Sequence, residues 1–463
     1  MKLGPLKLII FPLITGFILV SCNLNSNSYD ADVYSDPSFS SLKFTKLDSF
    51  PNLQNAKFTL EWDNALFDSV IINVDSLPYL TDIDTVKPTF SFKSTNKAYV
   101  HFLKGDSLEI NNTDSMNFDS INFVSNLSYH KDKYRKYPIR VNVHKVNPEV
   151  YVWQKINDGI YTHAGSRQRC IINNDHLYLF VNTGLKNYLH TSSDGINWSE
   201  QTVNGLPSDI PLNNILGLNG LFYTIDASNN YIYSSSDLLN WAVKYTSSDF
   251  NYKFINLLFV LNGKVWMTVQ SGTDGNYYIA SLDAVNGFQV RTQVPDKDKF
   301  PVGDFAAIGF TGRTGFPKAI VVGGVSSEGN TLYSTWSTED GVNWVNFSEQ
   351  NTTMNALPGA AIAWYDSKLL LFGKTQAVDY KSVNRFLVSK DEGLSWQVPD
   401  STVNVMYDSI RSIAYEARSY QSAVVNSNNQ LFVVGGNDGK LFTDVWRAKL
   451  NRLGFKRQDG ERW

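Results

Sequence analysis

The sequence has little cysteine and none of the residue arrangements that common catalytic or metal sites require. Among its 463 residues there are two cysteines, Cys22 and Cys170, and six histidines, none at a spacing typical of metal ligands. It has neither a Gly-x-Ser-x-Gly elbow nor a phosphate-binding loop. We therefore predict no metal and no cofactor.

The sequence also lacks a dominant charge and a second membrane-spanning segment. The 41 Lys and Arg residues nearly balance the 44 Asp and Glu residues, giving a net charge of −3, and the basic residues are dispersed. Nucleic-acid binding needs a basic patch or stripe, so no nucleic-acid partner is predicted. After residue 21 no apolar segment is long enough to span a bilayer.

The first 21 residues have the features of an export signal. Lys2 and Lys7 precede an apolar core over residues 8–20, which is shorter than a membrane span. The ending Leu19-Val-Ser-Cys22 resembles the lipobox of bacterial lipoproteins, which implies that Cys22 is acylated and begins the mature chain. The alternative is an ordinary cleaved signal. We expect an outer-membrane lipoprotein of the cell envelope, in contact with the membrane through its lipid anchor.

Two segments with different textures follow the signal. Residues 22–41 are rich in Ser, Asn and Asp, which cannot support a core, so a flexible tether is predicted. Residues 42–147 contain short alternating strand patterns over 56–62, 69–75, 88–94, 98–103, 121–125 and 137–146. About 100 residues of this kind without a disulfide indicate a small immunoglobulin-like β-sandwich. Cys170, left as a lone thiol, is expected to be a small buried hydrophobe.

In residues 148–463 a pattern of Ser, Asp, Gly and Trp occurs four times, in its fullest form as Ser389-Lys-Asp391-Glu-Gly393-Leu-Ser-Trp396. It resembles the Asp box of sialidase-like β-propellers, where it closes the turn between the outer two strands of a blade. Glycine supplies a positive φ, Ser and Asp satisfy turn amides, and Trp anchors the next strand. We therefore predict turn-forming and not catalytic roles for Ser192, Asp194, Gly195, Trp198, Asp237, Trp241, Asp340, Gly341, Trp344, Ser389, Asp391, Gly393 and Trp396.

The strand patterns around these turns repeat six times. Second strands are predicted over 176–181, 220–226, 263–270, 318–324, 368–374 and 430–436, and a third strand follows each of them. Two repeats lack the box, and the double glycines Gly323-Gly324 and Gly435-Gly436 resemble kelch blades. The predicted fold is all-β: the sandwich followed by a six-bladed β-propeller.

The sequence leaves two ways to close the ring. The segment around Trp153 resembles the fourth-strand segments of the repeats in sequence, but it precedes the first blade. It can therefore complete the last blade and remove the open edge of that blade's sheet. The alternative is a C-terminal strand beginning near Phe455.

Taken whole, the chain resembles an uncharacterised Gram-negative surface-lipoprotein family known as a domain of unknown function. The resemblance is carried by the lipobox, the tether, the propeller turns and the junction Arg140-Val-Asn-Val-His144-x-x-Asn-Pro148-x-x-x-x-Trp153. It implies a location and an architecture. It implies no reaction.

We predict a non-catalytic protein that binds a glycan or protein ligand on the loop face of the propeller. The Phe/Tyr-Arg-Ile-Pro motif of sialidases is absent. The alternative is a glycan-acting hydrolase whose carboxylates converge at the propeller mouth. The longest loops, 375–384 and 401–418, should lie side by side and carry the predicted ligand contacts Asp379, Tyr380, Arg411, Tyr415, Glu416 and Arg418.

The lipobox gives the first test. In cells that export the protein, Cys22→Ala removes the residue that would carry the lipid, so the variant should fractionate as a soluble protein. Membrane retention equal to that of the unmodified protein would contradict the lipoprotein prediction.

Overall fold

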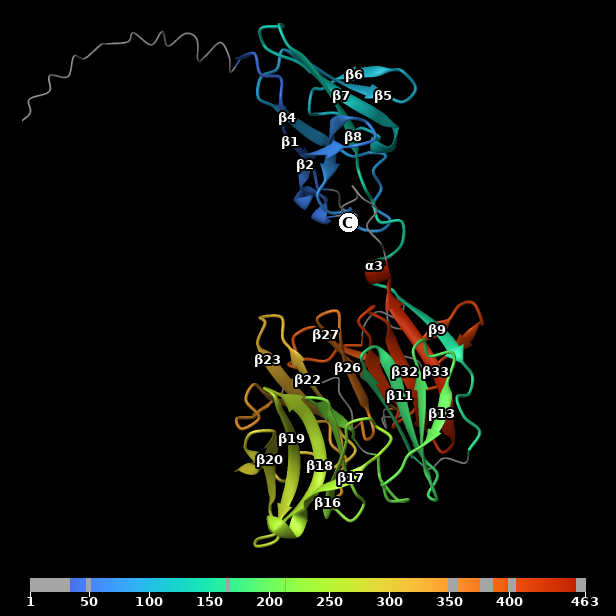
Figure 1. The fold of residues 1–463 in the computed structure, drawn as a ribbon. Helices are drawn as coiled ribbons and strands as arrows, with labels where there is room; N and C mark the ends of the chain where they lie inside the picture. Colours follow the sequence, from blue (N-terminus) through green and yellow to red (C-terminus); the bar gives the residue numbers. More distant parts are fainter. Residues whose placement is uncertain are drawn as a thin grey trace, which may run out of the picture. The chain divides into compact units, whose positions relative to one another are not determined.

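The computed structural model describes residues 34–46, 51–163, 167–212, 214–348, 357–374, 386–398 and 405–454. The chain divides into two compact units, the first ending at Val146 and the second beginning at Asn147. Both are built from strands, as Figure 1 shows. No helix among these residues is long and apolar enough to cross a membrane.

The first unit contains two sheets that share one core. Strands β1 (Phe39–Phe44) and β4 (Pro88–Phe92) form the smaller sheet. The larger has the order β2 (Phe58–Asp63), β3 (Asp68–Asn73), β8 (Tyr134–Arg140), β7 (Ile121–Leu127), β5 (Lys97–Phe102) and β6 (Ser107–Glu109), with β3 and β8 parallel. Two short 3-10 helices, η1 (Pro51–Asn55) and η2 (Phe118–Ser120), complete it. Phe44, Phe118 and Tyr137 are buried between the sheets.

The predicted tether reaches too far along the chain. Strand β1 begins at Phe39, and Phe39, Leu42 and Phe44 are buried. The Tyr137 hydroxyl accepts a hydrogen bond from the Phe39 amide at 2.9 Å. Residues 39–41 are therefore part of the folded unit, because three apolar side chains spaced over six residues hold the segment onto the core. Strands β1 and β6 were not predicted.

The second unit contains six sheets in its described residues. Four of them have four strands in chain order. The first is β10 (Arg167–Asn173), β11 (His176–Asn182), β12 (Asn187–Ser192) and β13 (Ser199–Thr202), and the second is β14 (Leu216–Leu218), β15 (Leu221–Ile225), β16 (Tyr231–Ser235) and β17 (Ala242–Thr246). The third is β18 (Tyr252–Leu261), β19 (Lys264–Ser271), β20 (Tyr277–Asp283) and β21 (Gly287–Gln293), and the fourth is β22 (Ala306–Thr311), β23 (Pro317–Val322), β24 (Thr335–Thr338) and β25 (Val345–Asn346).

The remaining two sheets differ from this pattern. The fifth has three named strands, β26 (Ala361–Tyr365), β27 (Lys368–Phe372) and β28 (Leu387–Ser389). The sixth has the order β30 (Ile413–Ala414), β29 (Tyr407–Asp408), β9 (Tyr151–Asn157), β33 (Leu441–Leu450), β32 (Leu431–Asn437) and β31 (Ser422–Val425). The 3-10 helix η3 (Ser247–Asp249) lies in the second repeat, and helix α3 (Asn451–Gly454) follows β33. Every predicted second strand coincides with one of these strands.

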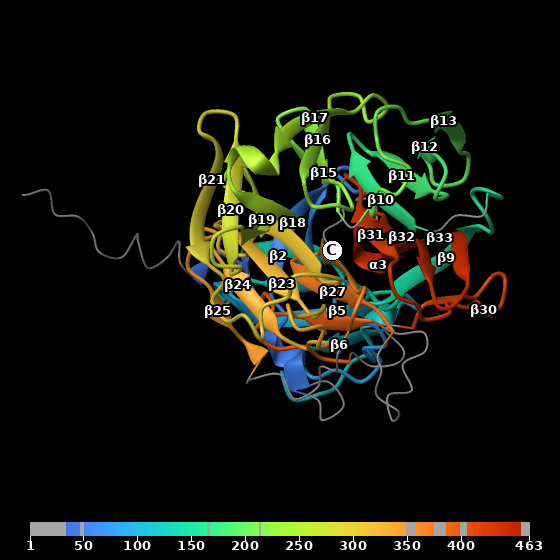
Figure 2. The same ribbon diagram turned by 90° about the horizontal axis from the view of Figure 1, so that it is seen from below.

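Consecutive sheets pack against each other, and the last packs against the first. Phe180 of the first sheet shares a core with Trp241 of the second, and further cores join each following pair of sheets. The cluster that contains Leu179 also contains Val434 and Val445 of the sixth sheet. The unit is therefore a closed ring, seen from below in Figure 2, which is the predicted β-propeller architecture.

Strand β9 closes the ring. It pairs antiparallel with β33, from Asn157 opposite Val445 to Tyr151 opposite Leu450. Trp153 is buried in the core between the fifth and sixth sheets. Of the two predicted routes to closure, the structure takes the one through the Trp153 strand. The alternative C-terminal strand from Phe455 lies outside the described residues.

The four repeated turns each lie after the third strand of a sheet and are held by the aspartate carboxylate. In the first turn Asp194 Oδ1 accepts hydrogen bonds from the amides of Ile196 at 2.7 Å and Asn197 at 2.9 Å, and from the Ser192 hydroxyl at 3.0 Å. Asp237 and Asp340 accept hydrogen bonds from the amides at the equivalent positions of their own turns, two and three residues further along the chain. Asp391 accepts from the amide of Ser395 at 2.9 Å. The carboxylates therefore replace backbone partners in tight turns.

The glycines of these turns allow neighbouring sheets to approach. Gly341 has φ +79°, and a Cβ there would lie 2.4 Å from the indole of Trp266 in the preceding sheet. Gly393 has φ +93°, and a Cβ there would lie 2.1 Å from Ile320. The second turn has Leu238 at the glycine position, with φ 66°, and its side chain fills the core between the first two sheets. The turns therefore also lock adjacent sheets together.

These contacts predict unequal effects for two substitutions in one turn. Trp396 is 1 % exposed, so Trp396→Ala should lower the free energy of unfolding by about 3–5 kcal/mol. Asp391→Ala removes turn hydrogen bonds and should cost about 1–2 kcal/mol. Urea denaturation of the full chain followed by tryptophan fluorescence measures both. A stably folded Asp391→Ala protein that has lost ligand binding would instead place this carboxylate in a binding site.

Candidate functional site

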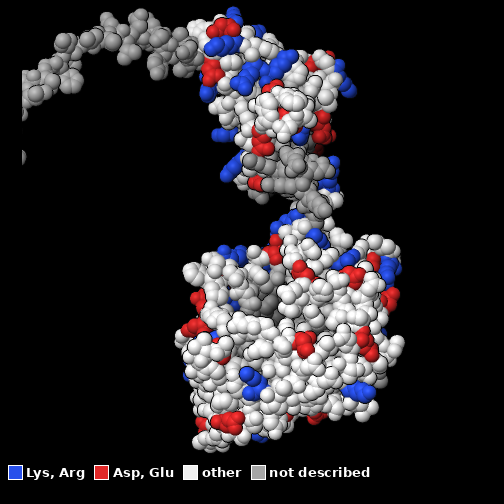
Figure 3. All heavy atoms as spheres, viewed as in Figure 1, with Lys and Arg blue, Asp and Glu red and all other residues white. Residues whose placement is uncertain are grey.

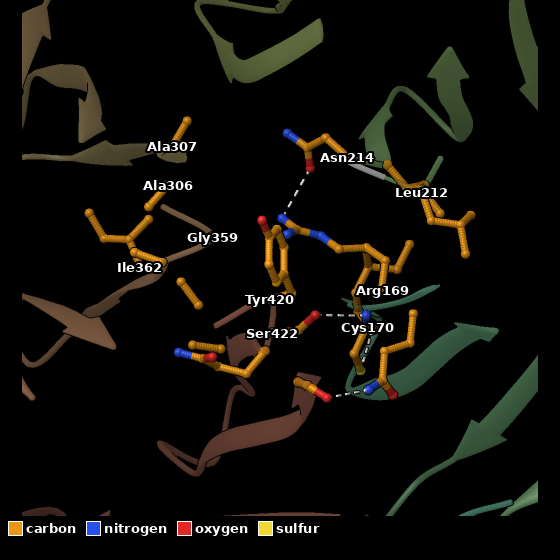
Figure 4. A pocket seen from close by; sticks show the side chains of 18 of the residues that line it. Arg169, Cys170, Leu212, Asn214, Ala306, Ala307, Gly359, Ile362, Tyr420 and Ser422 are labelled. Atoms are coloured by element: carbon orange, nitrogen blue, oxygen red, sulfur yellow. Dashed lines mark hydrogen bonds between the residues drawn. The ribbon is translucent and has the colours of Figure 1, made fainter. Parts of the chain in front are cut away.

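A cavity of about 560 Å³ lies at the centre of the ring. All six sheets contribute to its wall through their innermost strands or the residues just before them, as the close-up in Figure 4 shows in part. Of the thirty described residues that line it, twenty are apolar and ten have polar or charged side chains. A small-molecule site in a protein has this size and composition.

Arg169 is the main charged group of this wall. It follows Arg167 by two residues on β10, so both side chains leave the strand on the same side. Figure 4 shows the Arg169 side chain extending toward Asn214, whose Oδ1 accepts a hydrogen bond from Arg169 Nη2 at 3.1 Å. Burial lowers the pKa of this guanidinium. No carboxylate of the described residues forms an ion pair with it, and its Nε has no hydrogen-bond partner among them.

Asn214 holds this arginine in a defined place. Its Nδ2 donates to the carbonyl oxygens of Leu257 at 3.0 Å and Leu258 at 3.3 Å on β18. Since its other amide atom accepts from Arg169, Asn214 connects the first sheet to the third. The guanidinium is therefore fixed before any ligand arrives.

Two residues just before β31, in the sixth sheet that neighbours β10, also present polar groups. Gln421 is 1 % exposed, and neither atom of its amide has a hydrogen-bond partner among the described residues. Tyr420 is 50 % exposed, and its hydroxyl donates to Asp304 at 3.2 Å. Burial, followed by the charge of Asp304, raises the pKa of Tyr420. The tyrosine thus offers an aromatic face and a protonated hydroxyl to the cavity.

Three of the described lining residues carry a charge. Among the described lining residues Arg167 and Arg169 are the cations and Asp304 is the single carboxylate, which leaves a net charge of +1 from two minus one. A glycosidase needs two carboxyl groups facing the scissile bond. In the part of the chain that the structure covers, no group of three His, Cys, Asp or Glu residues is arranged to hold a metal ion.

Cys170 lies on the cavity wall and belongs to the core between the sixth and first sheets. It is 2 % exposed, and burial raises the pKa of its thiol to about 12. Its amide donates to the Ser422 hydroxyl at 2.9 Å, which connects the first and sixth sheets. The thiol is therefore protonated and packed, in keeping with the predicted buried hydrophobe.

The predicted ligand contacts near the sixth sheet occupy two kinds of position. Arg411 is exposed and pairs with Asp158 at 2.9 Å, and Glu416 pairs with Lys440 at 3.1 Å. Residues 407–414 form β29 and β30, which cover the outer edge of β9. The long connection thus protects a sheet edge far from the axial wall, because β9 would otherwise expose unpaired backbone groups.

Tyr415 and Arg418 are buried, which does not fit their predicted role as ligand contacts. Arg418 is 1 % exposed, forms an ion pair with Asp444 at 2.6 Å and stacks 3.6 Å from the ring of Phe442. Tyr415 is 4 % exposed and packs against Trp446. Both residues stabilise the sixth sheet, and a charged arginine is tolerated there because its carboxylate partner is buried with it. Asp379, Tyr380 and Cys22 lie outside the described residues.

The double glycine before Asn437 is explained by this buried arginine. Gly436 has φ +117°, and a Cβ there would lie 2.5 Å from Arg418 Cδ. A Cβ at Gly435 would lie 2.4 Å from Gln168 of the first sheet. Side chains at either position would displace the groups that join the last sheet to the first.

The carboxylates of the repeated turns have the environment of hydrogen-bond acceptors. Burial raises the pKa of Asp194, but the amides of Asn197 and Ile196 outweigh it and lower that pKa to about 2. The Asn240 backbone amide and side chain lower the pKa of Asp237. Such acids stay ionised near neutral pH and are poor proton donors.

Sequence reasoning did not single out Arg169, Asn214, Tyr420 or Gln421 as cavity residues. Their shared feature is that each lies on an innermost strand or just before one. A search for polar residues at these points of each repeat would have found them. Loop length, the criterion applied to the sequence, pointed to the sheet edge instead.

Charges of both signs are dispersed over one face of the second unit. Figure 3 shows Lys, Arg, Asp and Glu scattered on the face of the second unit that it presents. No continuous band of one sign covers that face.

Comparison with known proteins identifies the family. A model described as the DUF6242 beta propeller domain matches residues 147–458, and one described as the N-terminal domain of the same domain of unknown function matches residues 26–141. The chain belongs to the DUF6242 family. Membership confirms the predicted family of unknown function and its propeller, while the lipid anchor of this DUF6242 protein stays a prediction.

Solved structures add only a likeness of fold. An alpha-L-arabinanase of Penicillium chrysogenum is 11% identical at a TM-score of 0.42, covering 65% of this chain and 99% of its own. A gluconolactonase of Xanthomonas campestris is 11% identical at a TM-score of 0.39, covering 64% of this chain and 89% of its own. A triple arginine mutant of AofleA from Arthrobotrys oligospora is 9% identical at 0.38, covering 65% and 93%. Similarity this low carries no argument about activity. No curated protein matches the sequence.

The two arginines of the sixth sheet provide a test of these placements. Arg418→Ala leaves the buried Asp444 without its main partner, so the free energy of unfolding should fall by about 3–5 kcal/mol. Arg411→Ala removes an exposed ion pair and should change it by less than about 1 kcal/mol. Denaturant titration of both variants measures the difference. Equal stability of the two would contradict the buried position of Arg418.

Proposed function

We propose that this protein is a non-catalytic binding protein of the cell envelope that takes a glycan into the central cavity of its propeller. The observation that supports it is a cavity of about 560 Å³ whose wall combines apolar side chains with fixed polar groups. Rigid strands supply the wall, so little ordering is needed when a ligand binds. The exposed ring of Tyr420 offers a face on which a sugar can stack.

The lining favours binding over hydrolysis. The alternative, a glycan-acting hydrolase, needs a second carboxylate opposite Asp304, and the described lining residues include none. One oxygen of Asp304 already accepts a hydrogen bond from the Tyr420 hydroxyl. A protein partner that inserts a side chain into the cavity is the second candidate for the ligand.

Finer features of the architecture belong to the same proposal. Six sheets in a closed ring support a six-bladed propeller with Asp-box turns and kelch-like double glycines. Two sheets around one core support an immunoglobulin-like first unit that spaces or docks the propeller. The sequence Leu19-Val-Ser-Cys22 supports anchoring in the outer membrane through lipid on Cys22.

A binding screen with two matched variants tests the location of the site. The full chain is applied to a glycan array, with a peptide panel as the second arm, and each hit is measured against Tyr420→Ala and Arg411→Ala. Loss of the stacking face in Tyr420→Ala should weaken a glycan by about 1 kcal/mol, while Arg411→Ala leaves it unchanged. Thermal melting of both variants checks that the fold is intact.

The opposite pattern would move the site. Weakening by Arg411→Ala alone would place the ligand at the edge of the sixth sheet, where the sequence predicted it. Release of a shortened glycan during incubation would show hydrolysis and overturn the non-catalytic function.

A further inference from the structure

The cavity contains a guanidinium that forms no ion pair with any described residue. Arg169 has Asn214 as its side-chain partner, a neutral amide, and no carboxylate forms an ion pair with it in the described part of the chain. Arg418 and Arg411 of the second unit are paired with aspartates, whereas Arg447, like Arg169, donates to a neutral amide oxygen. Arg169 is half-buried, so its guanidinium is only partly hydrated, and an anion in the cavity would supply the counterion.

Some N–H groups of the Arg169 guanidinium have no hydrogen-bond partner among the described residues. One terminal nitrogen is held by Asn214, while Nε is shielded from solvent and has no hydrogen-bond partner among the described residues. A guanidinium offers parallel N–H groups that match the two oxygens of a carboxylate. Asn214 accepts a hydrogen bond from Nη2 only, so the remaining N–H groups of the terminal nitrogens can donate to an anion in the cavity.

Gln421 is a second, independent sign of a missing partner. Its side chain lines the same cavity, is 99 % buried and leaves both a donor and an acceptor unused among the described residues. Each such group costs about 1–3 kcal/mol when it is buried without a hydrogen bond. Natural proteins seldom keep an orphaned amide in this position unless water or a ligand satisfies it. An amide that can both donate and accept suits a sugar hydroxyl.

These groups define one class of ligand. We infer that the cavity binds an acidic sugar, with its carboxylate on Arg169, a hydroxyl on Gln421 and one ring face on Tyr420. This inference rests on the proposed function and specifies its ligand. Arg167 adds a second positive charge near the rim of β10, and Asp304, which is engaged by Tyr420, leaves the lining with a net charge of +1.

Calorimetric titration of the full chain with matched sugars tests the inference. Galacturonate and glucuronate are compared with galactose and glucose, which have a neutral hydroxymethyl group in place of the carboxylate. The acidic sugar should bind at least about tenfold more tightly, the effect of about 1.4 kcal/mol from a hydrogen bond to a charged group. Added salt should reduce this preference, whereas neutral-sugar binding should not change.

Three variants locate the charge. Arg169→Gln should abolish the preference for the acidic sugar, and Arg169→Lys should keep part of it. Arg313→Gln, which changes an exposed arginine outside the cavity, is the matched control and should behave like the unmodified protein. Equal preference in Arg169→Gln and Arg313→Gln would overturn the assignment.

Gln421→Met provides a readout that a structural role would not produce. It replaces an unsatisfied buried amide by an apolar side chain of similar length, so the melting temperature of the free protein should rise while the acidic sugar binds more weakly. A fall in melting temperature would show that the Gln421 amide stabilises the free protein, and would contradict its assignment as a ligand contact.

The outcomes separate this inference from the proposed function. Suppose that a neutral sugar binds as tightly as its acidic counterpart, and that its affinity falls in Tyr420→Ala but is unchanged in Arg169→Gln. This result would contradict the preference for an acidic sugar and would still support the glycan-binding function. Inorganic phosphate that binds through Arg169 while no sugar does would reduce the site to a simple anion site. Absence of binding by every acidic sugar would overturn the inference.

Discussion

The pairing of β9 with β33 is the interaction on which the rest of the propeller depends. It joins the first strand of the second unit to its last long strand through six register pairs, from Asn157 and Val445 to Tyr151 and Leu450. Because the ring closes there, the core between the sixth and first sheets can form around Leu179 and Val434. Without closure this core and the outer edge of β33 would face water, and the innermost strands would not surround a cavity.

Because the sheets form a ring, each has faces that pack against its neighbours and an inner strand that faces the axis. Apolar side chains pack between neighbouring sheets, where Trp266 lies against the Gly341 turn and Trp396 donates to the Thr335 hydroxyl of the preceding sheet at 3.2 Å. On the side that faces the axis, the innermost strands line the cavity and do not pack against another sheet. They can therefore carry Arg169, Asn214 and Gln421 without opening the hydrophobic cores, which is how a stable scaffold holds a polar site.

The sequence predicted the strands well because their signals are local. Glycine, aspartate and tryptophan recur with the blades, so the second strands and the turns at Asp194, Asp237, Asp340 and Asp391 could be placed in advance. The site could not, because Arg169 and Gln421 are 252 residues apart and only ring closure brings their strands to one axis. Arg418 was misjudged for a related reason: an arginine in a long loop is usually exposed, but Asp444 and the Gly435-Gly436 pair create a buried place for it.

Native-state hydrogen exchange on the full chain tests closure most directly. If β9 completes the ring, its amides bonded to β33 should exchange as slowly as those between β32 and β33, since all of them open only when the propeller opens. The outer strands β13 and β17, which are paired on one side, should exchange faster. Exchange of β9 as rapid as that of β13 and β17, with β33 still protected, would show that the strand is peripheral and would contradict the closed ring from which the cavity is derived.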